Sequence, residues 1–188
     1  PTWVPLDRVR VISNLASGET GFILAEQFKK RGFKVTLLLG PGNCNIKLNG
    51  IKLLRFKYFS ELDSILRKEL GSKKYSAVIH AAAVADFRPR RILSGKISSS
   101  VKKLKIDLVP TKKLIRNFKR YGKKLFTVGF KFEPAVGKEK LLAEGKKLLK
   151  SANLDLVVAN FNPGGNYRAY VLGNASQYGP FFTKAGMA

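Results

Sequence analysis

Apolar residues along the chain form short runs that alternate with stretches of helical spacing. The short runs predict strands at 35–39, 51–56, 75–82, 105–109, 125–130, 154–159 and, as an edge-like strand, 167–172. Apolar positions spaced by three or four predict helices over 22–31, 59–70 and 141–149, and Thr111 can cap another over 112–120. This alternation predicts an α/β protein with a Rossmann-like, three-layer fold and a mostly parallel central sheet.

Two stretches do not follow this pattern. Residues 90–103 are polar and lack a clear period, so we expect a mobile loop or flap there. Residues 176–188 form a tail to which no element is assigned. The chain has no internal repeats or low-complexity linkers, so we expect a single domain over 1–188, long enough to bury one core. No apolar run approaches the roughly 20 residues that a membrane span needs, so no membrane partner is expected.

The stretch from Ser13 to Gly21 carries the most suggestive chemistry. It follows an apolar run and leads into the predicted helix over 22–31. Gly18 and Gly21 leave little side chain at this turn, so a ligand can approach the backbone. Unpaired N–H groups at a helix start suit a phosphate, and Asn14 can offer both a donor and an acceptor. A purely structural turn fits the same Gly-x-x-Gly pattern.

The chain has one cysteine, Cys44, and one histidine, His80. These counts exclude an intramolecular disulfide and a Cys/His zinc cluster, and they fit a reducing cytoplasm. We therefore expect a cytoplasmic protein and assign no metal-ligating residue. His80 lies in the apolar run 78–82, which indicates a structural place at a strand end.

Positive charge is in large excess, with 36 Lys and Arg against 12 Asp and Glu and a net charge of +24. Such an excess suits polyanions such as nucleic acid, nucleotides or phosphorylated metabolites. The lysines are spread over nearly every segment, however, which is also typical of a solvated, lysine-rich surface. Charge alone therefore does not predict a nucleic-acid partner.

Several segments, taken together and in order, resemble the phosphopantothenate–cysteine ligases of coenzyme A synthesis, the CoaB-type domains. Each segment alone is weakly specific, but together they cover nearly the whole chain. The matching segments are residues 1–2, 7–14, 17–21, 40–41, 81–88, 95–97, 108–111, 128–130, 154–160 and 183–184.

The resemblance implies a dimeric, Rossmann-like enzyme that acts on small molecules. Such an enzyme activates the carboxylate of 4'-phosphopantothenate with CTP, or with ATP, in the presence of Mg²⁺. Pyrophosphate leaves, and the amine of L-cysteine attacks the acyl-nucleotidylate to form an amide. In many relatives a flavin-dependent decarboxylase is fused upstream, so FMN is expected only if such a domain is present.

The resemblance also implies roles for individual residues. Asn14 matches the asparagine that contacts the acyl-nucleotidylate, and Lys96 matches a lysine on a flap that closes over it. A charged residue on a mobile loop can complete a site after substrate binds. Asp86 matches a nucleotide-contacting acid, and Phe130 with two lysines would hold base and triphosphate. The full set of implied nucleotide-binding positions is Gly18, Gly21, Ala82, Asp86, Lys113, Leu114, Phe130, Lys146 and Lys150.

The chain departs from the family at several points. The strand and glycine-rich turn expected before Pro1 and Thr2 are absent, so we expect truncation at the N-terminus and an open slot in the sheet. A final helix is expected beyond Lys184, so we also expect truncation near the C-terminus. Lys112 and Lys113 stand where relatives have Pro-Asp, which leaves the choice between CTP and ATP open.

Two other functions compete with the ligase. A NAD(P)-dependent reductase would share the glycine turn, but it needs an acidic residue after the second strand, where this chain has Gly40-Pro41-Gly42. A nucleic-acid-binding module would need a basic stripe with interleaved aromatic residues, for which 112–124 is the best candidate. One such helix is thin support.

Overall fold

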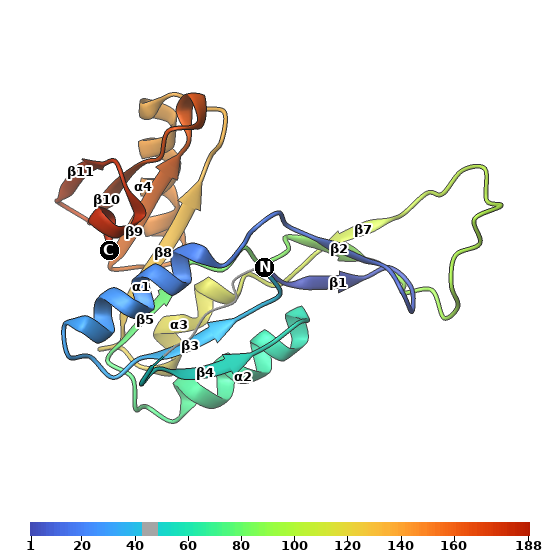
Figure 1. Cartoon of the computed structure of the whole chain (residues 1–188), viewed down its shortest axis with the longest axis horizontal. Helices are drawn as coiled ribbons and strands as arrows, with labels where there is room; N and C mark the ends of the chain where they lie inside the picture. Colours follow the sequence, from blue (N-terminus) through green and yellow to red (C-terminus); the bar gives the residue numbers. More distant parts are fainter. Residues whose placement is uncertain (43–48) are drawn as a thin grey trace.

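The computed structural model describes residues 1–42 and 49–188, so Cys44 lies outside the described residues. Its body contains a five-stranded sheet in the order β11–β10–β9–β8–β5 and a two-stranded sheet of β3 and β4 (Figure 1). The pairs β3–β4, β5–β8 and β8–β9 are parallel, whereas β10 is antiparallel to β9 and β11. The mostly parallel sheet predicted from sequence is confirmed. The strands are β3 (Thr36–Leu39), β4 (Lys52–Arg55), β5 (Ala77–His80), β8 (Phe126–Phe132), β9 (Leu156–Phe161), β10 (Arg168–Leu172) and β11 (Gln177–Phe181).

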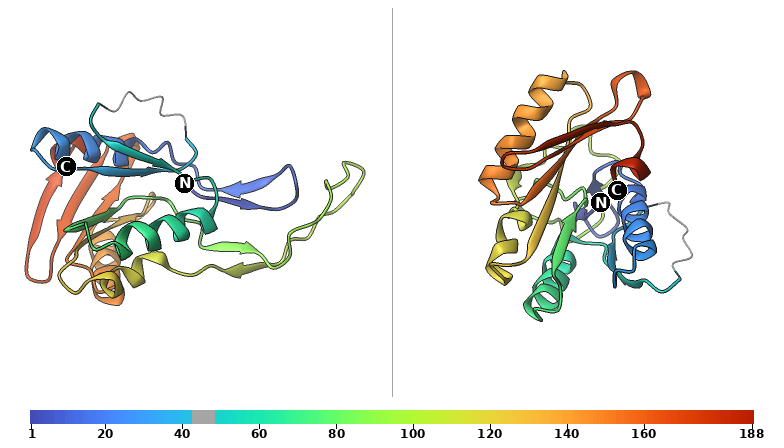
Figure 2. Two further views of the ribbon diagram at one scale, coloured as in Figure 1. Left: turned by 90° about the horizontal axis from the view of Figure 1, so that it is seen from below. Right: turned by 90° about the vertical axis from the view of Figure 1, so that its left-hand side faces the viewer.

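Helices cover both sides of these strands. In Figure 2, α1 and α4 lie on opposite faces of the sheet. The packing of α4 on the sheet is close, because a Cβ on Gly145 would lie 2.6 Å from Leu172 Cδ1. The helices are α1 (Glu19–Lys30), α2 (Phe59–Gly71), η1 (Leu114–Asn117), α3 (Phe118–Tyr121), α4 (Lys138–Ser151), η2 (Pro163–Gly165) and α5 (Lys184–Met187).

Successive residues of β3 pack against helices on opposite faces. Leu37 and Leu39 form a small core with Ala25 of α1, whereas Leu38 packs against the core that contains Leu62 of α2. This explains why β3 appears in the sequence as a wholly apolar run. A strand that is buried on both faces has no need of polar alternation.

The two sheets do not join. Within the described residues, β3 pairs only with β4, and β5 pairs only with β8. A hollow of about 700 Å³ lies between β3 and β5, and every residue of both strands lines it. We call it the β3–β5 hollow. The open slot expected in the sheet is therefore present.

A narrow arm extends from the body (Figure 1). It consists of two antiparallel pairs, β1 (Trp3–Pro5) with β2 (Val11–Ser13), and β6 (Phe87–Pro89) with β7 (Leu108–Pro110). Residues 90–107 connect β6 to β7 without a helix or strand, as predicted for 90–103. We call residues 90–107 the flap.

Three expectations about elements were wrong, and the elements of the tail were not predicted. The strand predicted over 105–109 starts only at Leu108, and the helix predicted over 112–120 is two short helices, η1 and α3. The strand at 168–172 is not an edge strand, because β11 pairs with it. The tail contains β11 and α5. Because most residues of β11 are exposed and Gly179-Pro180 lies within it, apolar periodicity gave no sign of this strand.

Candidate functional site

The glycine turn opens α1 onto the β3–β5 hollow. Gly18 is the N-cap of α1, with φ of 89°, and has no side chain to cap the helix, although Glu19 N donates to Ser17 Oγ at 3.3 Å. A Cβ at Gly18 would be strained and would lie 3.0 Å from Leu39 Cδ1, so glycine is required. Gly21 lies inside the first turn, where a Cβ would make an ordinary contact at 3.7 Å from Leu37 Cδ1. The backbone conformation therefore requires glycine at Gly18 but not at Gly21, and the approach of a ligand to either backbone stays a prediction.

Four of the predicted nucleotide-binding residues come together at this hollow. Gly18, Gly21, Ala82 and Phe130 all line it, although they come from the start of α1, the segment after β5, and β8. Asn14 lies just after β2 and is exposed. The carboxyl ends of parallel strands are where open α/β sheets place ligands.

Two polar atoms in the wall of the hollow have no partner. Neither Asn160 Oδ1 nor Tyr167 Oη, both buried, forms a hydrogen bond within the described part of the chain. Desolvation raises the pKa of Tyr167 to about 12, so its phenol keeps its proton at neutral pH. Unpaired buried polar atoms are costly unless a ligand or water satisfies them. Sequence reasoning missed both residues, because only the fold shows that they lack partners.

An ion pair brings the end of the described chain to the same wall. Lys184 at the start of α5 pairs with Glu19 in the first turn of α1, and Lys184 lines the hollow. Thr183 caps α5 by accepting a hydrogen bond from Gly186 N at 2.9 Å. The lysine neutralises a carboxylate that would otherwise repel an anion at the N-terminus of α1.

Asp86 and Lys113 form an ion pair with each other. Both side chains are about half exposed, at 62% and 47%, so they are accessible to a ligand. Leu114 was also predicted to bind the nucleotide, but it is only 4% exposed and packs in the core that contains Phe118. Its side chain therefore cannot contact a nucleotide, and only its backbone remains available.

The predicted pair on α4 lies elsewhere. Lys146 and Lys150 are exposed on α4, and α4 lies on the sheet face opposite α1. Neither residue lines the β3–β5 hollow. Their spacing on one helix face is as predicted, but the structure does not bring them to Gly18 and Phe130.

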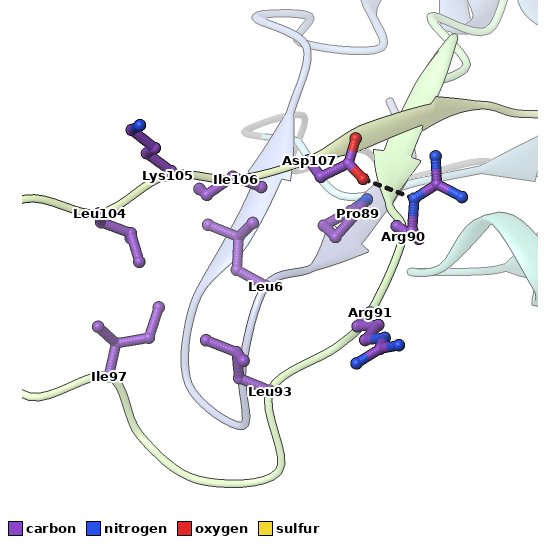
Figure 3. Close-up of a pocket in the computed structure, with 10 residues that line it drawn as sticks. All are labelled: Leu6, Pro89, Arg90, Arg91, Leu93, Ile97, Leu104, Lys105, Ile106 and Asp107. Atoms are coloured by element: carbon purple, nitrogen blue, oxygen red, sulfur yellow. Dashed lines mark hydrogen bonds and ion pairs between the residues drawn. The ribbon is translucent and has the colours of Figure 1, made fainter.

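Lys96 is exposed on the flap. The flap forms the end of the arm that points away from α1 (Figure 1). A second hollow of about 330 Å³ lies between the flap and the β1–β2 hairpin (Figure 3). One ion pair crosses its rim, from Arg90 Nε to Asp107 Oδ2 at 2.5 Å. The lining residues are Leu6, Pro89, Arg90, Arg91, Leu93, Ile97, Leu104, Lys105, Ile106 and Asp107.

The buried carboxylate of Asp7 fixes the flap to the hairpin. It accepts hydrogen bonds from Ile97 N at 2.9 Å, Val9 N at 2.8 Å and Arg10 N at 2.7 Å. The Arg10 guanidinium lies 2.5 Å from its second oxygen. The hydrogen bond from Ile97, followed by those from Val9 and Arg10, lowers the pKa of Asp7 far below its usual range.

We expect Asp7→Asn to loosen the flap. An uncharged amide is a weaker acceptor, so amides over 92–103 should exchange with deuterium about tenfold faster. Because the folded pKa of Asp7 is depressed, its stabilising effect is present above the unfolded pKa and is lost only as pH falls through the folded value. Flap protection in the unmodified chain should thus persist from pH 7 to about pH 4.

Hydrogen exchange with mass spectrometry measures both effects. The matched control is Asp107→Asn, which removes the same charge from an exposed ion pair in the flap. Equal flap exchange in the two variants would show that Asp7 is not the anchor.

The fold is that of an α/β protein with a Rossmann-like, mostly parallel sheet and a hollow between two of its parallel strands, β3 and β5. The chain belongs to the family of DNA/pantothenate metabolism flavoprotein C-terminal domains. The model of this family matches residues 1–168.

Curated relatives are bifunctional proteins of coenzyme A biosynthesis. The chain is 36% identical over 156 residues to CoaBC of Thermococcus kodakarensis, covering 82% of this chain and 38% of the relative. It is 34% identical over 166 residues to CoaBC of Haemophilus influenzae, covering 88% of this chain and 40% of that relative. The chain thus spans about two-fifths of the length of these relatives.

Solved structures share the fold. The DNA/pantothenate metabolism flavoprotein of Streptococcus pneumoniae superimposes with a TM-score of 0.87 at 21% identity, covering 99% of this chain and 90% of that one. A Cab2 mutant in complex with phosphopantothenate-cysteine superimposes with a TM-score of 0.76 at 22% identity, covering 94% of this chain and 76% of that one.

Among the described residues, no helix is both long and apolar enough to cross a membrane. No group of three or more His, Cys, Asp or Glu residues there is arranged to hold a metal ion.

Proposed function

We propose that the chain is the ligase module of coenzyme A synthesis, a single domain that joins 4'-phosphopantothenate to L-cysteine. The observation that carries the proposal is the opening of α1 at Gly18 onto a hollow shared with Ala82 and Phe130. This arrangement offers a phosphate site beside an aromatic ring, in a chain whose curated relatives are coenzyme A biosynthesis proteins. The phosphopantothenate-cysteine bound to the related Cab2 mutant is consistent with this substrate class.

The reaction has two steps. A carboxylate oxygen of 4'-phosphopantothenate attacks the α-phosphorus of CTP or ATP, and pyrophosphate leaves. The amine of cysteine then attacks the acyl carbon, the nucleoside monophosphate leaves, and the amine loses a proton. Negative charge develops on the α-phosphate in the first step, where N–H groups at the start of α1 and a lysine would stabilise it.

Mg²⁺ would enter with the triphosphate. The described residues offer no cluster of three acidic or histidine ligands, but Mg²⁺ usually binds through substrate phosphates and only one or two carboxylates. We propose Asp86, whose exposed carboxylate pairs with Lys113 in the structure, as one such carboxylate. The ion would neutralise charge on the leaving pyrophosphate.

We also propose that the protein works in the cytoplasm, where nucleoside triphosphates are supplied. A flavin-dependent decarboxylase would act next on the product, either fused to this module or as a separate partner. Any FMN would belong to that decarboxylase.

Release of pyrophosphate tests the function directly. Incubation with 4'-phosphopantothenate, Mg²⁺ and either CTP or ATP should release pyrophosphate, and cysteine should then complete turnover to the nucleoside monophosphate. The preferred nucleotide will be the one with the larger kcat/KM. Absence of pyrophosphate with both nucleotides, from a chain that is folded by circular dichroism, would refute the ligase.

We propose that the arm joins two copies of the chain. Exposed large apolar residues are unusually frequent on it: Val9 is 64% exposed, Ile92 61% and Phe87 54%. An exposed apolar patch of this kind marks an interaction surface, and the dimer is the assembly expected from the resemblance. The other exposed apolar residues of the arm are Val11, Leu93, Val101, Leu104, Ile106 and Leu108.

The double substitution Val9→Lys with Ile92→Lys should convert a dimer into a monomer, because two buried lysines would oppose association. Size-exclusion chromatography with light scattering measures the mass. Tyr178→Lys is the matched control and should leave the dimer intact, because Tyr178 lies on β11, outside the arm, and is 57% exposed. A monomeric unmodified chain at 50–100 µM, roughly the range where weak dimers form, would contradict the proposal.

The same arm supports a role for Lys96 in the second copy. The flap lies at the end of the arm that extends away from α1, β3 and β5 (Figure 1), and no flap residue lines the hollow of its own chain. In a dimer joined through the arms, the flap of one copy lies nearer to the body of the other. We propose that Lys96 completes the partner's site.

A further inference from the structure

Three segments, each the end of a helix and the loop that leads into the next strand, lie at one edge of the body. They are residues 29–34 before β3, residues 67–74 before β5 and residues 119–124 before β8. We call these three segments the basic rim. Strands that run in one direction begin at the edge opposite to their carboxyl ends, which is where open α/β sheets place their ligands.

Hydrogen bonds hold the beginnings of these strands beside one another. One joins Tyr75 Oη, just before β5, to Thr36 Oγ1 at the start of β3, at 3.1 Å. In another, Phe126 N at the start of β8 donates to Ser76 O at 2.8 Å. The three segments of the basic rim are therefore neighbours in space, although some 90 positions of the sequence separate the first from the last.

The basic rim carries positive charge that carboxylates do not balance. Each of its segments contains four Lys or Arg residues, and Glu69 is its single acid, already paired with a lysine of β4. Within the described residues, Arg67 and Lys119 are the only cations of the rim in ion pairs. The remaining cations are all exposed: Lys29, Lys30, Arg31, Lys34, Lys68, Lys73, Lys74, Arg120, Lys123 and Lys124.

Helix dipoles account for only part of this charge. A cation in the last turn of a helix is stabilised by the negative end of the dipole, and the effect is lost beyond that turn. Several exposed cations lie past the helices, in the loops that lead into the strands. Like charges that are crowded together repel and lower stability, so an unbalanced cluster of this size indicates an anionic partner. The cations beyond the helices are Lys34, Lys73, Lys74, Lys123 and Lys124.

Exposed aromatic rings lie among these cations. Phe33, next to Lys34, is 54% exposed, and Phe126, at the end of the loop that carries Lys124, is 45% exposed. Nucleic-acid bases stack on such rings while cations meet the phosphates, and the bases of a single strand are free to do so. An anionic lipid surface or an acidic protein offers no bases. The combination of rings and cations therefore favours a single-stranded nucleic acid.

We propose that the basic rim binds single-stranded nucleic acid, with phosphates on its lysines and arginines and bases on Phe33 and Phe126. Affinity that comes from charge and stacking has little sequence preference. The rim and the proposed nucleotide site lie at opposite edges, since a Cβ on Gly18 would lie 3.0 Å from Leu39 Cδ1 at the carboxyl end of β3. A bound strand would thus leave the opening of α1 free.

A fluorescent RNA of about 15 nucleotides tests the charge, by anisotropy at several salt concentrations from about 50 mM upward. The rim variant carries Arg120→Gln, Lys123→Gln and Lys124→Gln. It should bind about tenfold or more weakly at about 50 mM salt. The slope of log K against log salt should fall by about 2, because each phosphate contact of a single strand contributes about 0.7.

The matched control removes the same charge from the flap, by Lys102→Gln, Lys103→Gln and Lys105→Gln. It should bind RNA as the unmodified chain does, to within about twofold. Equal weakening in the two triple variants would show that RNA responds to net charge alone and would overturn the proposal. Lack of RNA binding by the unmodified chain at about 50 mM salt would refute it.

Alanine substitutions test the stacking. Phe126→Ala should weaken RNA binding by about fivefold or more with the salt slope unchanged, and Phe33→Ala should do the same if Phe126→Ala does not fold. Phe132→Ala is the matched control, since Phe132 is 49% exposed at the other end of β8. Unchanged RNA binding in both Phe33→Ala and Phe126→Ala would overturn the assignment to nucleic acid.

Other polyanions separate the remaining sources of negative charge. Vesicles of phosphatidylglycerol that bind the chain more tightly than RNA does would assign the basic rim to a lipid surface. Polyglutamate that competes as well as RNA would assign it to acidic protein. The rim variant should release pyrophosphate at the normal rate, and none of the binding measurements uses ligase substrates, so the proposed function stands or falls separately.

Discussion

Lys96→Gln should lower kcat for pyrophosphate release by about 100-fold or more while leaving the fold unchanged. Lys96 is exposed on the flap and forms no ion pair within the described residues, so its loss costs no structural contact. A cation that meets charge developing on a phosphate contributes mainly to the transition state. Lys102→Gln is the matched control, since it removes the same charge from the same flap. Equal rates in the two variants would remove Lys96 from the site.

Asn14→Asp should lower kcat for pyrophosphate release about as much as Lys96→Gln does. The substitution replaces a neutral amide by a negative charge where an anion would bind. The exposed Asn174→Asp, in the turn after β10, controls for the added charge. Normal turnover in Asn14→Asp would refute its assignment.

Mixing the two inactive variants tests whether Lys96 acts on the partner's site. Random exchange of subunits between the Lys96→Gln and Asn14→Asp variants places half of the chains in mixed dimers. In each mixed dimer one of the two sites has an intact Asn14 and an intact Lys96, the latter supplied by the other chain. We therefore expect about one quarter of normal activity to return on mixing. If Lys96 serves its own chain, mixing restores nothing.

The second large effect is expected for Gly40→Ala, which should destabilise the fold by about 3 kcal/mol or more. A Cβ at this position would overlap the Pro1 carbonyl oxygen and lie 2.7 Å from Phe56 Cε2. Neither neighbour can move easily, since one is backbone and the other belongs to a residue only 4% exposed. Urea unfolding at neutral pH measures the loss.

Gly71→Ala is the matched control for this substitution. Gly71 ends α2, and a Cβ there has no atom within 4 Å, so alanine should leave stability unchanged or raise it slightly. A loss below about 1 kcal/mol for Gly40→Ala would show that Pro1 and Gly40 do not pack as described.

The fold was largely predictable because apolar periodicity reports burial. Leu141 and Leu149 face inward from α4, as their spacing indicated, and the buried run over 154–159 is most of β9. The hairpin of β1 and β2 was not predicted. Its strands have three residues each, too few for a pattern, and they are held by pairing with each other and by Asp7.

The candidate site was predictable only in part. Gly18 and Phe130 lie together because parallel strands and the following helices place their ends at one edge of a sheet. Lys146 does not line this hollow, and its predicted role stays a prediction. Helical spacing indicates which residues share a face of a helix, but not which side of the sheet the helix covers. Asn160 was missed, since a buried amide oxygen is notable only when its neighbours are known to offer no donor.

The ion pair between Glu19 and Lys184 has a consequence for synthesis. It joins the first long helix of the chain to the last short one, across 165 positions, and α5 also packs on β10 and β11. A nascent chain can assemble α1, β3 and β5 long before Lys184 leaves the ribosome. During that interval Glu19 faces the hollow without its cation, so a ribosome-bound chain should bind nucleotide poorly until α5 emerges.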